Sequence, residues 1–456
     1  MNRDETERRE RGAPATHSDA PDASGSDDQG EREGGTAGSG GRTEGSDDEA
    51  TERDGSAPRT DGGEPDADTT TASGSTSLDA VTFDGDGRAP IYPGRRGLAL
   101  FTCLAVVGAA FAVDYAAPPD ATPLFGADPT QTDWLFVPAL VCLGAVVVPV
   151  VTDPDRRTRV LETCRARPAV GVATAYLVAF VGLGLVGPSL VADVTSDLAR
   201  SNQPPLGFTA PASVVTGCVG TLTDAGCPGT LQSPLGTNRQ GIPMSVVIVR
   251  GMRVSLQVAV VVGVLVVPVA AVVGTLAGYV GGWVDTLAMR YVDVQQTVPA
   301  FLVYIVLTYA LGQSLFLLVL VFGLTSWGGV ARVVRDEVVQ LRETSFVDAA
   351  VVHGVGHVRL VVRHVLPNLG GTVATAVTQR IPAILFAEAA ISFLLLNDTS
   401  VPSWGLSISQ GFRAQAPFLD IWWVSTVPVA FLAGTVVAVT VVGDALRDAL
   451  DAQTTL

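Results

Sequence analysis

Two ionisable side chains, Arg380 and Glu388, lie within an apolar stretch long enough to cross a membrane. Ionisable groups are costly in hydrocarbon and usually face a bundle interior or an aqueous path. Glu388 therefore either lies on a translocation path or gate, or forms hydrogen bonds to backbone or to a neighbouring span. An Arg380–Glu388 pair is poorly aligned, because eight residues carry a helix about 80° past two full turns.

Three histidines, His353, His357 and His364, lie close together in the sequence. Gly354 and Gly356 break the helical spacing that a zinc-binding pair would need, and no cysteine is near. We therefore expect no metal site, and we expect His364 to pack and hydrogen-bond within its own segment. No Ser/His/Asp set, paired carboxylates or Cys-x-x-Cys pattern indicates an enzyme active site.

The chain contains no lysine, and its 29 Lys and Arg positions are all Arg. A P-loop needs a lysine to reach the nucleotide phosphates, and Schiff-base chemistry needs a lysine amine. We therefore expect a protein that is not an enzyme, has no ATPase site of its own and binds no cofactor.

A polar stretch at 344–371 interrupts the apolar sequence. Ser345 and Asp348 have the spacing of a capping box, which predicts the start of a short helix. Ala349 and Ala350 give this helix a small-residue face that could approach the groove of another protein closely. We interpret the stretch as a docking element.

The second half of this stretch predicts a turn and another helix. Gly354 and Gly356 favour the turn. The following Val, Leu and Arg residues predict a helix that runs to Leu366 and ends at Pro367. The outcome is a helix–turn–helix elbow that lies along the membrane.

Eight stretches have the roughly 20 apolar residues that a membrane-spanning helix needs. Small residues in the fourth, Gly263, Gly274 and Gly278, predict close helix packing. The eight predicted spans are about 98–116, 134–151, 169–192, 254–280, 297–313, 315–331, 372–396 and 421–443.

Arginine is unevenly distributed between the loops, and basic loops favour the cytoplasm. The loop 152–168 holds five Arg, whereas the loop 117–134 holds none. We therefore expect both termini and the stretch 344–371 in the cytoplasm. A long loop at about 193–253 and another at about 397–420 then face outside.

The predicted domains differ sharply in composition. Residues 1–88 carry 23 acidic residues and nine Arg, a net charge of −14 out of −16 for the chain. Such a segment cannot bury enough apolar surface to fold, so we expect a disordered acidic cytoplasmic tail. The other predicted domains are two extra spans with an Arg-rich cytoplasmic loop at 89–168, a six-span core at 169–445 and a C-terminal tail at 446–456.

Two of the five cysteines, Cys218 and Cys227, lie in the long outside loop. An oxidising exterior would let them form a disulfide, and two unpaired thiols are an almost equally good interpretation.

The elbow resembles the EAA loop of ABC-importer permeases, through Asp348–Ala350, Gly354 and His364-x-Leu-Pro-Asn368. In that family the loop forms a coupling helix that docks into a cleft of a separate ATP-binding subunit. The resemblance assigns this ATPase coupling to Ser345, Asp348, Ala349, Ala350, Gly354, His364, Leu366, Pro367 and Asn368.

The flanking motifs resemble the dipeptide/oligopeptide/nickel branch of this family, specifically its C-type transmembrane subunit. The resemblance covers about 169–445 in the right order, and residues 1–168 lie outside it. The motifs are LGT at 235–237, GMRVSL at 251–256, AGYVGGWVD at 277–285, ARVVRDEV at 331–338, FAEAAISFLL at 386–395 and PSWG at 402–405.

Three positions depart from the family pattern. Asp348 stands where Glu is usual, which shortens the acidic arm by one methylene and keeps the charge. The family's LGTD-x-x-GRD reads LGTNRQGIP at 235–243, without either Asp or the Arg, and its SFLGLG reads SFLLLN at 392–397.

We therefore expect an all-α polytopic membrane protein with about eight transmembrane helices after a disordered tail. The resemblance implies a plasma-membrane permease subunit of an ATP-driven importer of peptides, with nickel or another small solute as the alternative. It implies a B-type permease, two ATP-binding subunits that use the ATP, and an extracytoplasmic solute-binding protein as partners, and no nucleic acid. An ion-gradient-driven secondary transporter and a membrane scaffold are the rival classes.

Overall fold

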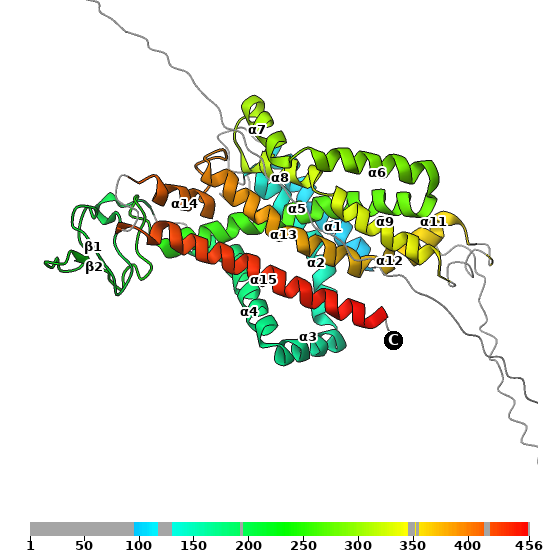
Figure 1. Cartoon of the computed structure of the whole chain (residues 1–456), viewed down its shortest axis with the longest axis horizontal. Coiled ribbons are helices and arrows are strands. Elements are labelled where there is room, and N and C mark those ends of the chain that lie inside the picture. The colour runs from blue at the N-terminus through cyan, green and yellow to red at the C-terminus, as the bar shows by residue number, and fades with distance from the viewer. Residues whose placement is uncertain are drawn as a thin grey trace, which may run out of the picture. The chain divides into compact units, whose positions relative to one another are not determined.

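Helices, several of them long and apolar, form most of the described chain (Figure 1). The computed structural model describes residues 95–116, 130–191, 195–344, 352, 355–414 and 420–454. The predicted tail at 1–88 lies outside these residues. The predicted all-α polytopic fold is confirmed.

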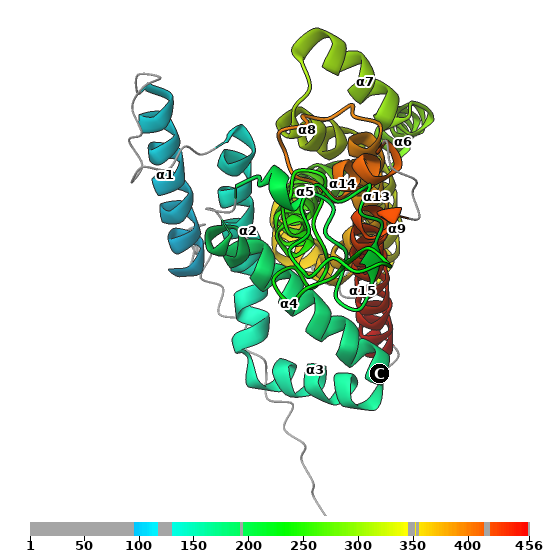
Figure 2. The same ribbon diagram turned by 90° about the vertical axis from the view of Figure 1, so that its left-hand side faces the viewer.

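Three helices precede the region of family resemblance: α1 (Arg95–Ala116), α2 (Gln131–Thr152) and α3 (Pro154–Ala166). Thr130 and Asp133 cap the start of α2 reciprocally, each side chain accepting from the other residue's backbone N–H. The stretch 152–168, predicted as a loop, is mostly the helix α3, which begins at a proline, as helices often do. Figure 2 shows α1 beside α2, at the edge of the helices.

The longest helix, α5 (Met244–Val280), lies at the centre and contacts α2, α4, α8, α9 and α13 (Figure 2). It begins ten residues before the predicted start at 254. Arg250 and Arg253 lower the apolar character of these first turns, but both have partners on other elements. Arg250 donates to the Val191 carbonyl at 3.1 Å, and Arg253 pairs with Asp133 at 3.0 Å.

Two helix pairs follow α5. The first, α6 (Gly282–Thr297) and α7 (Ala300–Leu311), is bent by 69° at the break between them. The second, α8 (Leu315–Thr325) and α9 (Gly328–Arg342), is interrupted at Ser326–Trp327. The predicted fifth span at 297–313 therefore corresponds mainly to α7, which is only 12 residues long.

The C-terminal part contains α11 (His357–Leu360), the π-helix η2 (Val361–Val365), α12 (Leu366–Asn368) and α13 (Gly370–Phe393). The short helix α14 (Trp404–Phe412) lies within the predicted outside loop. The last helix, α15 (Trp423–Thr454), extends well past the predicted span end at 443. It packs against α4 (Pro168–Leu190), whose Tyr176 hydroxyl donates to the Phe431 carbonyl at 3.0 Å.

The segment between α4 and α5 forms a small polar fold. It contains the 3-10 turn η1 (Leu198–Arg200) and two short antiparallel strands, β1 (Thr209–Ala210) and β2 (Cys227–Pro228). Ala210 lies opposite Cys227 in the register. Figure 1 shows this segment and α11–α12 at opposite ends of the helices.

Among the described residues, five helical stretches are long and apolar enough to cross a membrane, and the bent α6–α7 pair could make a sixth. A shorter apolar helix covers Leu100–Ala116. The helix α13 is not among them, since Gln379, Arg380 and Glu388 reduce its hydropathy. The predicted number of eight spans therefore stays a prediction. The five are Gln131–Pro149, Pro168–Leu190, Met244–Val280, Leu315–Arg342 and Trp423–Ala449.

Trp404 is one of two fully buried tryptophans in the described part of the chain, and it joins α14 to α5. Its indole N–H donates to the Ile248 carbonyl at 3.1 Å, and its ring lies against Gly251. The next residue, Gly405, lies against the Ala389 carbonyl. The helix α14 is therefore part of the core between α5 and α13.

Candidate functional site

The first half of the predicted elbow lies outside the described residues. This half includes Ser345, Asp348, Ala349, Ala350 and Gly354. Their predicted docking helix and its contact with an ATP-binding subunit stay predictions.

The second half of the elbow continues into α13 with only Leu369 between them. The prediction that Pro367 ends this helix is wrong. Proline lacks an N–H and its ring crowds the carbonyl four residues before it, and the π-helical turn of η2 widens the helix there. Asn368 Nδ2 donates to the His364 carbonyl at 2.6 Å, so this main-chain group keeps a partner.

The elbow is attached to the C-terminal end of α5. The Tyr279 hydroxyl and His357 Nδ1 are 2.6 Å apart, and the two rings meet edge to face. Three apolar side chains of the elbow are buried: Leu360, Val365 and Leu369. His357 therefore has a hydrogen-bonding role at this junction.

The helix α9, which leads into the elbow, packs directly on α5. Gly274 lies against the Ala331 carbonyl and Val334, and Gly278 lies against Val338. Side chains at these two glycines would push the helices apart. The close packing predicted from the small residues of α5 is therefore present at Gly274 and Gly278, where α5 and α9 form a tightly packed pair, but not at Gly263.

Ion pairs tie α6 to the other side of α9. Arg335 pairs with Asp285 at 2.5 Å, and Arg332 pairs with Asp293 at 2.6 Å. The Arg335 pair is the less exposed of the two. A movement of α9 would therefore carry α6 with it.

Glu388 lies in a packed polar network within α13. Its side chain is almost fully buried, and it accepts a hydrogen bond from Ser392 Oγ at 2.8 Å. Asn397 Nδ2 donates to the same hydroxyl at 3.3 Å. These contacts hold the loop that follows α13, so the observed neighbours of Glu388 are structural. Its place on a translocation path stays a prediction.

Arg380 is half-buried and lines a cavity of about 240 Å³. The predicted Arg380–Glu388 pair is not formed, and Arg380 has no hydrogen bond or ion pair with any described residue. The polar side chains on the walls are Gln295 and Gln296 of α6, and Thr325 and Ser326 at the break after α8.

A second cavity, of about 600 Å³, lies near the N-terminal ends of α2 and α5. Asp133 on its wall pairs with Arg253 and accepts from Gln257 Nε2 at 2.8 Å. The Arg253 guanidinium also lies 4.4 Å from the centre of the Phe136 ring. This cluster attaches α2 to α5.

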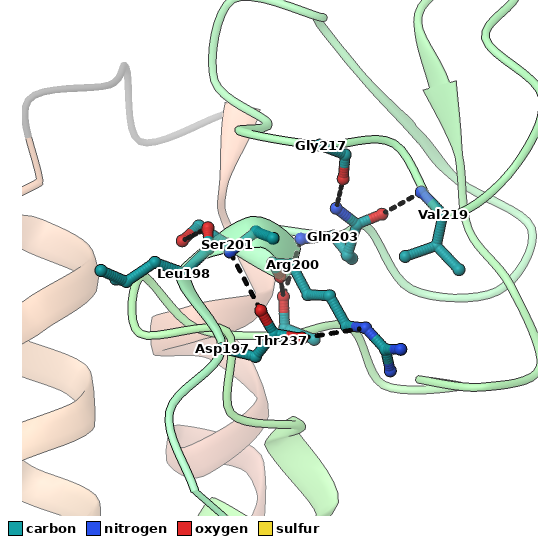
Figure 3. Close-up of polar contacts among 9 residues, drawn as sticks. Asp197, Leu198, Arg200, Ser201, Gln203, Gly217, Val219 and Thr237 are labelled. Atoms are coloured by element: carbon teal, nitrogen blue, oxygen red, sulfur yellow. Dashed lines mark hydrogen bonds and ion pairs between the residues drawn. The ribbon is translucent and has the colours of Figure 1, made fainter.

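Main-chain contacts of Gln203 and Thr237 organise the segment between α4 and α5 (Figure 3). The Gln203 amide group donates to the Gly217 carbonyl and accepts from Val219 N–H at 3.2 Å. Thr237 Oγ1 accepts from Gln203 N–H at 2.8 Å and donates to the Arg200 carbonyl at 2.6 Å. The bonds of Thr237 to Gln203 and Arg200 join the start and the end of the segment between α4 and α5.

Cys218 and Cys227 form a disulfide in this segment, so the structure contains one of the two states that the sequence left open. The altered LGTNRQGIP motif lies nearby. Asn238 Oδ1 accepts from the backbone N–H groups of Gln240 and Ile242, at 3.0 and 2.9 Å. An amide oxygen accepts such bonds as a carboxylate would, so this turn does not require the family's aspartate.

Several residues that make these contacts were not predicted from the sequence. Tyr279 and Gln295 lie within apolar or mixed helices, and nothing in their spacing indicates a role. Gly328–Gly329 is an adjacent glycine pair after an apolar run, which could have indicated close approach of other side chains.

These elements define a polytopic membrane protein: apolar helices, with breaks between α6 and α7 and between α8 and α9 at the level of a polar cavity. Residues 270–455 match the family described as the binding-protein-dependent transport system inner membrane component.

Three relatives are similar over about half of this chain. The oligopeptide transport system permease protein OppC of Haemophilus influenzae is 34% identical over 217 residues, 47% of this chain and 69% of the relative. The dipeptide transport system permease protein DppC of Bacillus subtilis is 32% identical over 245 residues, 54% and 75% of the two chains. OppC of Escherichia coli K12 is 34% identical over 219 residues, 47% and 71%. The chain belongs to this family, in the oligopeptide and dipeptide branch of ABC-importer permeases.

Proposed function

We propose that this chain is a permease subunit through which an ATP-driven importer moves short peptides across the plasma membrane. The observation that carries the proposal is the similarity to permeases named for oligopeptide and dipeptide transport. A nickel chelate or another small solute is the alternative cargo.

The proposal assigns the remaining tasks to partner subunits. A B-type permease completes the path, and an extracytoplasmic solute-binding protein delivers the cargo. Two ATP-binding subunits use the ATP, since a chain without lysine lacks the P-loop residue that contacts the phosphates. The N- and C-termini and the elbow face the cytoplasm, and the disulfide-bonded segment faces outside, where oxidising conditions favour a disulfide.

The connectivity around the elbow suggests how ATP-driven motion reaches the path. The helix α9 enters the elbow and α13 leaves it. The cavity with Arg380 lies where the α8–α9 break meets the middle of α13. Closure of the ATP-binding subunits would push the elbow, and the α5–α9 pair and α13 would then rock relative to each other. This motion would open the path to one side at a time.

The test is reconstitution of the chain with its co-purifying subunits and binding protein in liposomes. Uptake of a labelled dipeptide should require ATP and persist when ion gradients are dissipated. A chain that purifies without any ATPase in mild detergent, or uptake that ignores ATP and stops when the gradient collapses, would favour a secondary transporter. That mechanism usually needs intramembrane acids, and in the described spans only Glu388 is deeply buried.

Removal of residues 1–88 distinguishes the permease from a scaffold. A permease should keep its ATP-dependent uptake without the acidic tail, whereas a scaffold whose tail is the working part would lose function.

A further inference from the structure

The cavity beside Arg380 lies at the level of two helix breaks. Its wall includes Val298 and Pro299, between α6 and α7, and Thr325 and Ser326, at the end of α8. In transport proteins, irregular backbone within a span occurs where it lines a cavity or a binding site. The cavity is therefore placed as a binding site would be.

Arg380 lies near the middle of α13. Ten residues separate it from Gly370 and thirteen from Phe393, so it is roughly 15 Å from one end of the helix and roughly 20 Å from the other at 1.5 Å per residue. The hydrocarbon core is about 30 Å thick. A lipid phosphate at the membrane surface is therefore too far away to be the natural partner of this guanidinium.

A glycine pair lets the two key side chains approach the start of α9. A Cβ atom at Gly328 would collide with Gln295 Oε1, and a Cβ at Gly329 would collide with the Arg380 guanidinium. Gln295 Oε1 and the Arg380 guanidinium therefore lie over neighbouring residues of the same helix turn, close to the cavity that both residues line.

These two side chains offer opposite hydrogen-bonding groups. Arg380 is a cation without a partner among the described residues, and no carboxylate belongs to the described wall of the cavity. Gln295 Nε2 donates to the Leu324 carbonyl at 3.3 Å, while its buried Oε1 has no donor in the described part of the chain. A charge at this depth is costly unless an anion compensates it, and a buried acceptor is costly without a donor.

We propose that Arg380 and Gln295 form a subsite for the C-terminal residue of a peptide in transit, which rests on the proposed function. The peptide carboxylate accepts from the Arg380 guanidinium, and the N–H of the same peptide residue donates to Gln295 Oε1. A bare inorganic anion would satisfy only the arginine. At about 240 Å³ the cavity holds the end of a peptide rather than a whole one, because whole-ligand pockets run from about 300 to 1,000 Å³.

The experiment compares a labelled tripeptide with its C-terminal amide in liposomes that contain the full transporter. Binding of both peptides to the solute-binding protein is measured separately, and uptake is recorded with that protein saturated, so that its own preference does not enter. The variants are Arg380→Gln, Arg380→Lys and the control Arg290→Gln. Arg290 is an exposed residue of α6 outside the cavity wall. Each variant must co-purify with the ATP-binding subunits, and these subunits must bind ATP normally in the assembled transporter.

The unaltered chain should take up the free-acid peptide about tenfold faster than the amide, because a hydrogen bond to a charged group contributes that much or more. Arg380→Gln should remove most of this preference by slowing the free acid alone. Arg380→Lys should keep part of it, and Arg290→Gln should keep all of it.

Equal slowing of both peptides in Arg380→Gln would overturn the subsite and indicate a structural role, and so would an unchanged preference. Failure of the unaltered chain to take up either peptide with ATP is a different result. It would overturn the proposed function itself.

Discussion

At the residue scale, the glycines of α5 set how closely other elements approach this helix. Gly251 lies against the Trp404 indole, whereas the nearest atom to a Cβ at Gly263 is a Val377 methyl at 3.7 Å. The first approach leaves no room for a methyl group, and the second is ordinary van der Waals contact. The same substitution should therefore have opposite effects at two positions of one helix.

We predict that Gly251→Ala lowers the stability of the protein by about 1 to 3 kcal/mol, since Trp404 or α5 must move. Gly263→Ala should be neutral or stabilise by up to about 1 kcal/mol, because alanine favours the helix. The measurement is the thermal unfolding midpoint of both variants in the same detergent. Equal midpoints for the two would show that Trp404 does not pack on Gly251 as described.

At the element scale, the described second half of the elbow is attached to the C-terminal end of α5. The Tyr279–His357 hydrogen bond joins α11 to α5, and Leu360 of α11 is fully buried. The helices α11, η2 and α12 run into α13 with only Leu369 between them, so we expect the described half of the elbow to move together with α13. Loss of the link should weaken coupling without unfolding the core.

We predict that Tyr279→Phe lowers ATP-driven uptake about two- to tenfold, because a net hydrogen bond contributes about 0.5 to 1.5 kcal/mol. Tyr309→Phe is the matched control, since Tyr309 in α7 is 97% exposed and bonds to nothing described. Uptake and ATPase activity are measured together in liposomes. Unchanged uptake per ATP in Tyr279→Phe would rule out a coupling role for this contact.

At the scale of the whole molecule, the helices outside the family resemblance are fixed to the core at a partly buried cluster. Asp133 of α2 receives Arg253 and Gln257 of α5, and Phe136 lies under the guanidinium. At the far end, Arg167 pairs with Asp448 of α15, but both side chains are more than half exposed, so this pair contributes little. Of these two charged contacts, the one at Asp133 therefore contributes more to holding the helices α1, α2 and α3 on the core.

We predict that Asp133→Asn destabilises the protein by about 1 to 3 kcal/mol, because a partly buried Arg253 loses its charged partner. Asp293→Asn removes the more exposed pair with Arg332 and should cost less than about 1 kcal/mol. Thermal unfolding of the two variants in detergent distinguishes them. A larger loss in Asp293→Asn would contradict the anchoring role of Asp133.

Features that depend on local composition could be predicted from the sequence. Apolar runs predicted the helical membrane core, and the prediction that ATP chemistry belongs to another chain rests on the missing lysine. Gly274 and Gly278 predicted close packing, because small residues on one face of a helix let another helix approach it closely. The family motifs identified the class of protein, because the motifs and their order along the chain can be recognised without knowing which residues are in contact.

Features that depend on partners distant in sequence became visible in the three-dimensional structure alone. The start of α5 was predicted too late in the sequence, because Arg250 and Arg253 lower the hydropathy of its first turns. Their partners, the Val191 carbonyl and the Asp133 carboxylate, are known only from the structure. Pro367 was expected to end a helix, but a π-turn accommodates it. The grouping of Gln295, the Gly328–Gly329 pair and Arg380 at one cavity arises from three elements and two helix breaks, and no sequence spacing encodes it.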